Sequence, residues 1–211
     1  MEGGLPGHLF YRNCITAVVI RERPTRARNV RQGRQRFIDN LQPDERSVFE
    51  TALVSGAGPL IDLVHWWNDL CGKIRAQIGL DCMVQARDAE MLTIKLELTR
   101  LNAAGVDKEP EWPGLDNNYA GYDVLSWRVT GNYLQPLLIE VKSTTASPLR
   151  FKVTRNEWKT AVNAGDRYIF HIWDMTKSPE VLYTKTVAEV RVHIPVNQEK
   201  GQWDIAEIPL V

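Results

Sequence analysis

The 211-residue sequence predicts an α/β or α+β domain, in which helices flank a mixed central sheet, together with a helical N-terminal extension. Apolar residues recur at helical spacing in residues 37–53 and 59–80. After Gly105 the residue pattern changes from helix-like to strand-like, because β-branched and aromatic residues occur in short runs separated by Gly, Asn and Pro. We therefore expect a mainly helical region at 1–85 and a mixed α and β domain at 86–211.

The elements of the second region follow from local signals. Residues 88–105 contain no internal Gly or Pro and predict one helix, with Asp88 able to cap its start and Gly105 placed to end it. A second helix is expected at 156–165, after a strand-like turn. The segments with strand texture are residues 122–129, 133–144, 167–173, 181–185 and 187–196.

Composition excludes several classes of protein. A hydrophobic content of 44% favours a globular domain, and the formal net charge of zero provides no overall field toward nucleic acid or membrane. The three cysteines and four histidines show no spacing typical of disulfide frameworks or zinc sites. The apolar stretch 14–20 is too short for a membrane span and precedes its arginines, so we expect a cytoplasmic protein that contacts no membrane.

Positive charge is concentrated in residues 21–36, which hold seven arginines and one glutamate. A solvated arm is one interpretation of this segment. The other is contact with the phosphate backbone of nucleic acid, for which the candidates are Arg26, Arg28, Arg31 and Arg34. The sequence leaves both interpretations open.

The strand at 133–144 carries an acid and a base on one face. Side chains alternate along a strand, so Glu140 and Lys142 share a face opposite to that of Ile139 and Val141. A solvated ion pair would explain this pattern. However, a hairpin turn at 131–132 would bring Asp123 beside Glu140, and two converging carboxylates suit a hard cation such as Mg²⁺ or Mn²⁺. Lys142 could then stabilise charge on a phosphate or position the attacking water.

This arrangement of Asp123, Glu140 and Lys142 resembles the PD-(D/E)XK superfamily of restriction-endonuclease-like nucleases. The motifs AGYDVLSW, LIEVKST, FKVTRNEW and RYIFHIW, within residues 120–173, are similar to those of the NO VEIN C-terminal domain family. The resemblance implies a restriction-endonuclease-like fold, action on DNA, and a place in bacterial restriction or anti-phage defence with possible partner subunits. Tyr122 stands where the superfamily formula has Pro.

The resemblance also implies supporting residues. An acid from the helix before the first strand usually joins the site, and Glu90 and Glu97 both qualify, because a separation of seven residues places them on one side of a helix. Each could instead pair with Arg87 or Arg100. Near the next helix, Asn156 and Glu157 would stand close to the site, although Glu157 could equally form a capping box with Thr154.

The sequence thus predicts a Mg²⁺-dependent or Mn²⁺-dependent DNA endonuclease with Asp123 and Glu140 as metal ligands and Lys142 as the catalytic cation. The competing hypothesis is a nuclease-like fold that has lost turnover and serves as a nucleic-acid-binding or protein-interaction module.

Overall fold

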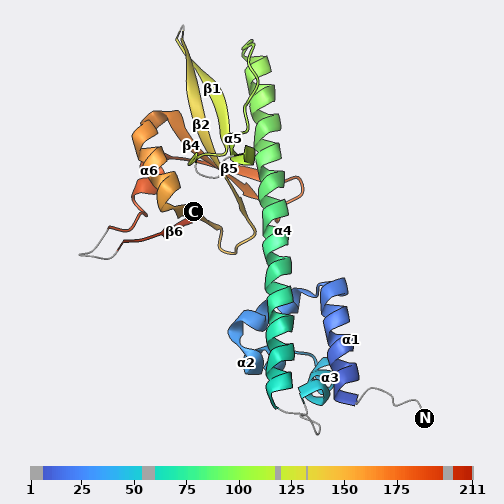
Figure 1. Ribbon diagram of the computed structural model, residues 1–211. Helices are drawn as coiled ribbons and strands as arrows, with labels where there is room; N and C mark the ends of the chain where they lie inside the picture. Colours follow the sequence, from blue (N-terminus) through green and yellow to red (C-terminus); the bar gives the residue numbers. More distant parts are fainter. Residues whose placement is uncertain (1–6, 54–59, 117–119, 132, 197–201, 211) are drawn as a thin grey trace. The chain divides into compact units, whose positions relative to one another are not determined.

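The computed structural model describes residues 7–53, 60–116, 120–131, 133–196 and 202–210 (Figure 1). Contacts within the chain divide it into two compact units, Met1–Cys82 and Met83–Val211. The fold is the mixed α and β class that the sequence predicts, with a central mixed sheet and a helical N-terminal region. None of the helices in the described ranges is both long enough and apolar enough to cross a membrane.

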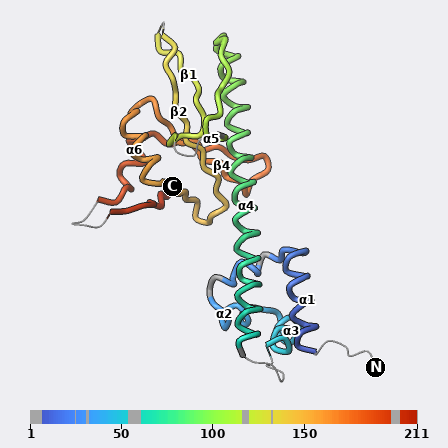
Figure 2. The backbone as a smooth tube through the Cα atoms, in the orientation of Figure 1, coloured from blue at the N-terminus to red at the C-terminus, as the bar shows by residue number. Residues whose placement is uncertain are grey.

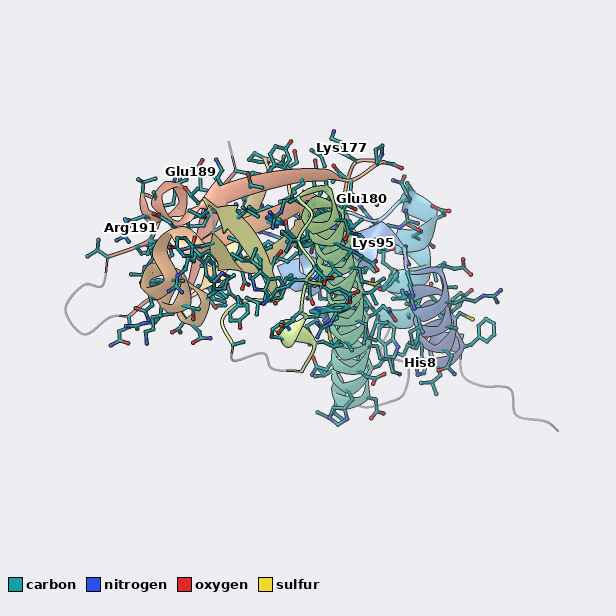
Figure 3. The ribbon with its side chains drawn as sticks, turned by 90° about the horizontal axis from the view of Figure 1, so that it is seen from above. His8, Lys95, Lys177, Glu180, Glu189 and Arg191 are labelled. Carbon is teal, nitrogen blue, oxygen red and sulfur yellow. The ribbon has the colours of Figure 1, made fainter. Side chains whose placement is uncertain are left out.

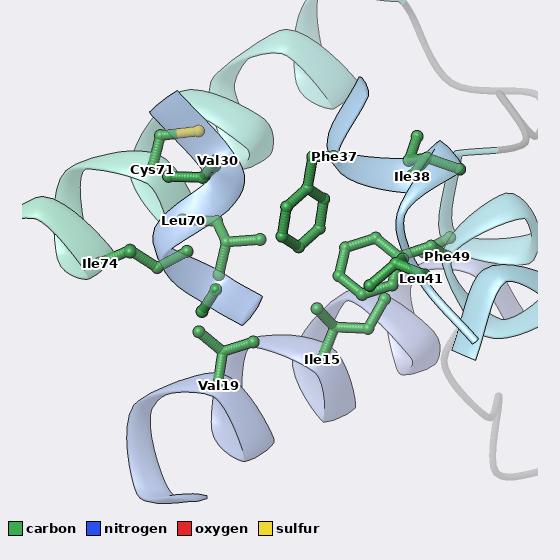
Figure 4. Close-up of a cluster of buried hydrophobic side chains, with 12 residues drawn as sticks. Ile15, Val19, Val30, Phe37, Ile38, Leu41, Phe49, Leu70, Cys71 and Ile74 are labelled. Atoms are coloured by element: carbon green, nitrogen blue, oxygen red, sulfur yellow. The ribbon is translucent and has the colours of Figure 1, made fainter. Parts of the chain in front are cut away.

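The N-terminal unit is built from helices around a single apolar core. Figure 4 shows Phe37 in this core beside Phe49, with ring centroids 5.3 Å apart in an edge-to-face arrangement, and Leu70 fully buried nearby. Such aromatic packing stabilises a small helical core beyond its buried area. Its helices are α1 (Gly7–Glu22), the 3₁₀ helix η1 (Thr25–Gln32), α2 (Arg34–Asp39), α3 (Pro43–Leu53) and the first part of α4 (Leu60–Ala103).

Helix α4 corrects one expectation. The sequence predicts a helix that starts at Asp88, but α4 begins at Leu60 and passes through Asp88 without interruption. Asp88 is exposed within the helix, where an aspartate costs only a few tenths of a kcal/mol. Its capping propensity was therefore no evidence for a helix start. Gly105, with φ of +67°, lies just beyond the helix end as expected.

The C-terminal unit contains a four-stranded sheet in the order β1-β2-β4-β5. β1 pairs with β2 and β4 with β5 in antiparallel fashion, whereas β2 and β4 are parallel, so the sheet is mixed. Pairing of β2 with β4 begins only at Leu138, and the outer part of the β1–β2 hairpin therefore extends past β4 (Figure 2). The strands are β1 (Val124–Thr130), β2 (Tyr133–Thr144), β4 (Tyr168–Asp174) and β5 (Val181–Thr186).

Helices cover both faces of this sheet (Figure 1). On one face, Ala89 of α4 packs against Val124, Ile139 and Val141. On the other, α6 (Arg155–Ala164) and α7 (Val187–Arg191) pack over Phe170 and Ile172. Short α5 (Pro113–Asp116) lies in the segment that leads into β1, and η2 (Gly165–Arg167) follows α6.

The expected strand at 187–196 is wrong, because residues 187–191 form α7. Thr186 caps this helix and Glu189 completes a capping box, a helix-start signal that outweighs the β-branched residues which follow. Figure 3 labels Glu189 and Arg191 on this helix, and Lys177 and Glu180 in the turn between β4 and β5. Two further strands, β3 (Arg150–Thr154) and β6 (Ile205–Pro209), form a separate antiparallel pair. β3 was expected only as a strand-like turn, and β6 was not expected.

Candidate functional site

The face of β2 that lies away from α4 carries a buried ion pair. Glu140 is 3% exposed, and its Oε1 lies 2.5 Å from the Nζ of Lys142. The same ammonium lies 3.0 Å from Oε2 of Glu157, at the start of α6. A solvated strand pair would leave both groups in water, so burial excludes the simpler interpretation of this motif.

Asp123 lies directly before β1 and beside Glu140. Because Val124 pairs with Ile139, the residue before Val124, which is Asp123, lies opposite Glu140 of β2. The Asp123 backbone N–H donates to the Ile139 carbonyl at 3.0 Å, and its Oδ2 accepts from the Val141 N–H at 2.8 Å. These two bonds hold the carboxylate at the end of the hairpin, as the sequence predicts.

Tyr168, the first residue of β4, contacts both the loop before β1 and strand β2. Its hydroxyl donates to the Gly121 carbonyl at 2.7 Å and lies 3.3 Å from Oε2 of Glu140. The side chain is 2% exposed. Tyr168 therefore couples the loop that leads to Asp123 with the strand that carries Glu140.

Two glycines allow this loop to approach the rest of the site. Gly121 has φ of +75°, and a Cβ there would lie 2.2 Å from Oγ1 of Thr160 on α6. A Cβ on Gly114 would lie 2.9 Å from both the Cα and Oδ1 of Asp123. Gly114 thus keeps the space beside Asp123 Oδ1 open, and Gly121 allows the loop to lie against α6.

The electrostatics of the cluster are dominated by negative charge. Asp123, Glu140 and Glu157 share one ammonium, that of Lys142. Burial raises the pKa of Asp123 to about 6, against the opposing Val141 hydrogen bond and Lys142 charge. Burial also raises the pKa of Glu140 to about 8, and the neighbouring carboxylates add to the shift. The cluster therefore favours a bound proton or an additional cation.

The remaining two groups keep fixed charge states. Burial lowers the pKa of Lys142, but the charges of Glu140 and Glu157 together outweigh it, and the net direction is upward. Burial raises the pKa of Tyr168 well above its ordinary value, and Glu140 adds to this. Lys142 thus stays an ammonium and Tyr168 a neutral hydroxyl at physiological pH.

The residues fit a hard divalent cation in part. Asp123 and Glu140 offer carboxylate oxygens, and Gly114 leaves room beside Asp123 Oδ1. Among the residues that the structure describes, no group of three or more His, Cys, Asp and Glu side chains is arranged to hold a metal. A cation held by these two carboxylates would take its other ligands from water or substrate, which is usual for Mg²⁺.

The two helix acids lie in different surroundings. Glu90 accepts from Arg87 at 2.6 Å and from Nε1 of Trp112 at 2.5 Å, and its charge contributes to the raised pKa of Asp123. It is 7% exposed. Of the two candidates, Glu90 is therefore the one whose charge acts on Asp123.

Glu97 belongs to a second polar cluster on the α4 face of the sheet. It accepts from the Ser126 hydroxyl at 2.6 Å and from Arg100 Nη2 at 2.6 Å. Burial lowers the pKa of neighbouring His171 to about 4, and the charge of Glu97 only partly opposes this. The pairing of Glu97 with Arg100, and of Glu90 with Arg87, matches the alternative that the sequence left open.

Glu157, at the start of α6, both caps this helix and belongs to the ion-pair cluster. Thr154 and Glu157 form the capping box that the sequence left open, in which the Thr154 N–H donates to Glu157 Oε2 at 2.9 Å. That oxygen also contacts Lys142. Asn156 is exposed beside Gly121, where a Cβ on the glycine would lie 3.4 Å from its Nδ2.

The arginine-rich segment is packed against the N-terminal unit. Ala27 and Val30 are each 6% exposed in η1, which excludes a free arm for this part of the chain. Arg26 is exposed and pairs with Glu45, and Arg28 and Arg34 are exposed. The side chain of Arg31 lies outside the described part of the structure. An apolar cavity of about 270 Å³ borders Arg28 and contains none of the candidate catalytic residues.

Several residues of the site were not found from the sequence. In the sequence, Tyr168 is simply part of an apolar strand, and Gly114 and Gly121 are loop residues. Their roles were missed because their partners come from distant parts of the chain. Trp112, with its indole N–H directed to Glu90, offered no local signal. The glycines were the only detectable signal, since an isolated Gly before a strand often marks close backbone approach.

Comparison with known proteins supports the resemblance over part of the chain. Residues 89–184 match the family described as Protein NO VEIN, C-terminal, which confirms that part of the expectation. No curated protein matches the chain. A nuclease from a fusselovirus is a structural neighbour, with a TM-score of 0.37 and 14% sequence identity over 63% of this chain and 84% of that chain.

Proposed function

We propose that the C-terminal unit is a divalent-metal-dependent phosphodiesterase of the PD-(D/E)XK type that cleaves DNA. The observation that carries this proposal is the cluster of three carboxylates around one ammonium, at the junction of β1, β2 and α6, in which Glu140 is buried and the other groups are half-buried. Structural ion pairs usually balance charge, whereas this cluster has an excess of acid. Groups with strongly perturbed pKa values of this kind are typical of catalytic sites.

Asp123 and Glu140 would hold the metal, Mg²⁺ or Mn²⁺. When bound, such an ion supplies Lewis-acid stabilisation of a phosphate oxygen. The protein itself fixes the carboxylates through the Val141 N–H and the Tyr168 hydroxyl. Lys142 is held by Glu140 and Glu157, so its ammonium is positioned to neutralise charge on the phosphate or to orient the attacking water.

A role in bacterial restriction or anti-phage defence, with partner subunits that supply recognition, belongs to the same proposal. It rests on the family resemblance of residues 89–184. The exposed arginines Arg26, Arg28 and Arg34 of the N-terminal unit are candidate phosphate contacts within it.

A second candidate function is a non-catalytic binding module. It is favoured by the contacts of Glu140, whose Oε1 pairs with Lys142 and whose Oε2 lies next to the Tyr168 hydroxyl. Both carboxylate oxygens therefore have partners without any metal. In this case the cluster would stabilise the domain and turnover would be absent.

A cleavage assay distinguishes the two candidates. Purified protein, Glu140→Gln and Lys142→Ala are incubated with plasmid and linear DNA in Mg²⁺ or Mn²⁺. The control is Lys185→Ala, which removes the 3.9 Å pair with exposed Glu189 on β5 and α7. Cleavage by the parent and control that falls at least about 100-fold in both site variants supports the enzyme. Metal-dependent cleavage that survives either site change would contradict it, and absence of cleavage by the parent favours the binding module.

A further inference from the structure

Arg87, on α4, is held rigidly at the border of the candidate site. Its Nη1 donates to Glu90 Oε2 at 2.6 Å and to the Gly114 carbonyl at 3.1 Å. Its guanidinium also lies over the Trp112 ring, 5.8 Å from the centroid. Three different contacts therefore fix the plane of this side chain. Because the side chain is already ordered, binding of a ligand costs less side-chain entropy than it would for a mobile arginine.

These contacts leave one edge of the guanidinium available. Both hydrogen bonds use Nη1, and within the described part of the chain the Nε and Nη2 hydrogens of Arg87 have no hydrogen-bond partner. The side chain is 37% exposed. The Nε and Nη2 donors form the fork that binds two oxygens of a phosphate or carboxylate.

Arg100, further along α4, is an arginine whose hydrogen bonds all go to the protein, and it provides a comparison for Arg87. It also pairs with a glutamate three residues away, and its side chain is 38% exposed. However, its Nε donates to Glu97 at 3.0 Å and its Nη2 donates to Glu97, to Ser126 and to the Trp127 carbonyl. The fork of Arg100 is thus occupied by the protein, whereas that of Arg87 is not.

Arg87 also lies close to the candidate catalytic carboxylate. Gly114, whose carbonyl accepts from Arg87, donates its N–H to the Asp123 carbonyl at 3.0 Å. A Cβ on that glycine would touch Asp123 Oδ1. One residue therefore contacts both Arg87 and Asp123, and a group bound at the Arg87 fork would be a neighbour of the carboxylate cluster.

We propose that the Nε–Nη2 edge of Arg87 binds a backbone phosphate of the nucleic acid, next to the phosphate positioned at Asp123 and Glu140. This assignment rests on the proposed function, because it identifies a substrate contact of the same site. A fixed cation beside an acidic cluster has a clear physical use. It attracts the polyanionic substrate toward carboxylates that would otherwise repel it.

The test is the salt dependence of DNA binding, measured by fluorescence anisotropy with a labelled 20-base-pair duplex in Ca²⁺ buffer. Arg87→Ala is expected to bind about tenfold more weakly and to lower the slope of log K against log salt by about 0.9, which corresponds to one lost phosphate contact. Arg87→Lys keeps the charge but lacks the fork, so its slope should match the parent while its affinity falls. Arg100→Ala is the matched control and should leave the slope unchanged.

The outcomes separate this inference from the proposed function. If the parent binds DNA normally and Arg87→Ala keeps both its affinity and its slope, the Arg87 assignment is wrong and the proposed function stands. If the parent binds no DNA, both are overturned. Equal losses in Arg87→Ala and Arg100→Ala would show that disruption of a helix ion pair, and no phosphate contact, causes the effect. Circular dichroism melting curves of all variants accompany the titrations.

Discussion

Replacing Asp123 by Asn should stabilise the metal-free protein while it abolishes the proposed activity. Burial raises the pKa of this carboxyl to about 6 from an ordinary value of 3.8. At about 1.4 kcal/mol per pH unit, the ionised carboxylate costs the folded state up to about 3 kcal/mol. Asn has nearly the same shape, retains a carbonyl oxygen for the Val141 N–H, and carries no charge.

The gain should depend on pH in a defined direction. The folded pKa of Asp123 lies above the unfolded value, so the folded state binds the proton more tightly and the acid destabilises the fold only once it ionises. The cost is absent below about pH 3.8, grows between about 3.8 and 6, and is complete above about 6. The advantage of Asp123→Asn should therefore increase with pH over that interval and then level off.

Thermal unfolding in EDTA between pH 4 and 8 measures this effect. A gain of about 3 kcal/mol raises the melting temperature by about 6–12 °C in a chain of this size. Asp88→Asn, an exposed position on α4, is the control for removal of one negative charge. Addition of Mg²⁺ should stabilise the parent and the control but not Asp123→Asn, because a ligand stabilises only the state that binds it.

Two results would refute this reasoning. A lower melting temperature for Asp123→Asn at pH 7.5 would mean that the ionised carboxylate stabilises the fold. A gain that stays constant from pH 4 to 8 would mean that charge is not its cause. Either result would refute the inference that excess negative charge makes this site favourable for a bound cation.

Two further predictions concern the surroundings of Asp123. Gly121→Ala should lower the free energy of unfolding by about 2–3 kcal/mol, through the positive φ and the clash with Thr160 on α6. The matched control Gly131→Ala has φ of +59° but nothing within 4 Å, so chemical denaturation should show a smaller loss, and equal losses would exclude the clash. Glu90→Gln should reduce DNA cleavage, whereas Glu97→Gln should lower only the melting temperature, since Glu97 serves the cluster around Ser126. Kinetics and melting curves for both variants decide this, and an effect of Glu97→Gln on turnover alone would reverse the assignment.

Local sequence patterns determined much of the C-terminal unit. Alternation in β2 placed Ile139 and Val141 on one face and Glu140 and Lys142 on the other, and the structure confirms this. The Thr154 capping box, one of the two alternatives that the sequence left open for Glu157, is also present. Both features depend on residues within a few positions of each other, where the chain's own geometry limits the arrangement.

Predictions failed where two local signals competed. The β-branched residues of 187–196 favoured a strand, but the capping box at Thr186 and the buried Val187 and Val190 produce a helix. The prediction that a helix starts at Asp88 was wrong because a capping residue is also tolerated within a long helix. Strand β6 was missed because its partner, β3, lies some 50 residues away, and pairing with a distant strand has no local signature.

The sequence by itself determined which side chains are candidates for the chemistry: Asp123, Glu140 and Lys142 were proposed from residue types and spacing. Only the tertiary structure distinguishes Glu90 from Glu97, since both lie on one side of α4 and differ in what packs against them. It alone revealed Tyr168, Gly114 and the open fork of Arg87. The physical reason is that burial, charge excess and hydrogen-bond satisfaction are properties of neighbours in space, and folding brings these neighbours together from segments that are far apart along the chain.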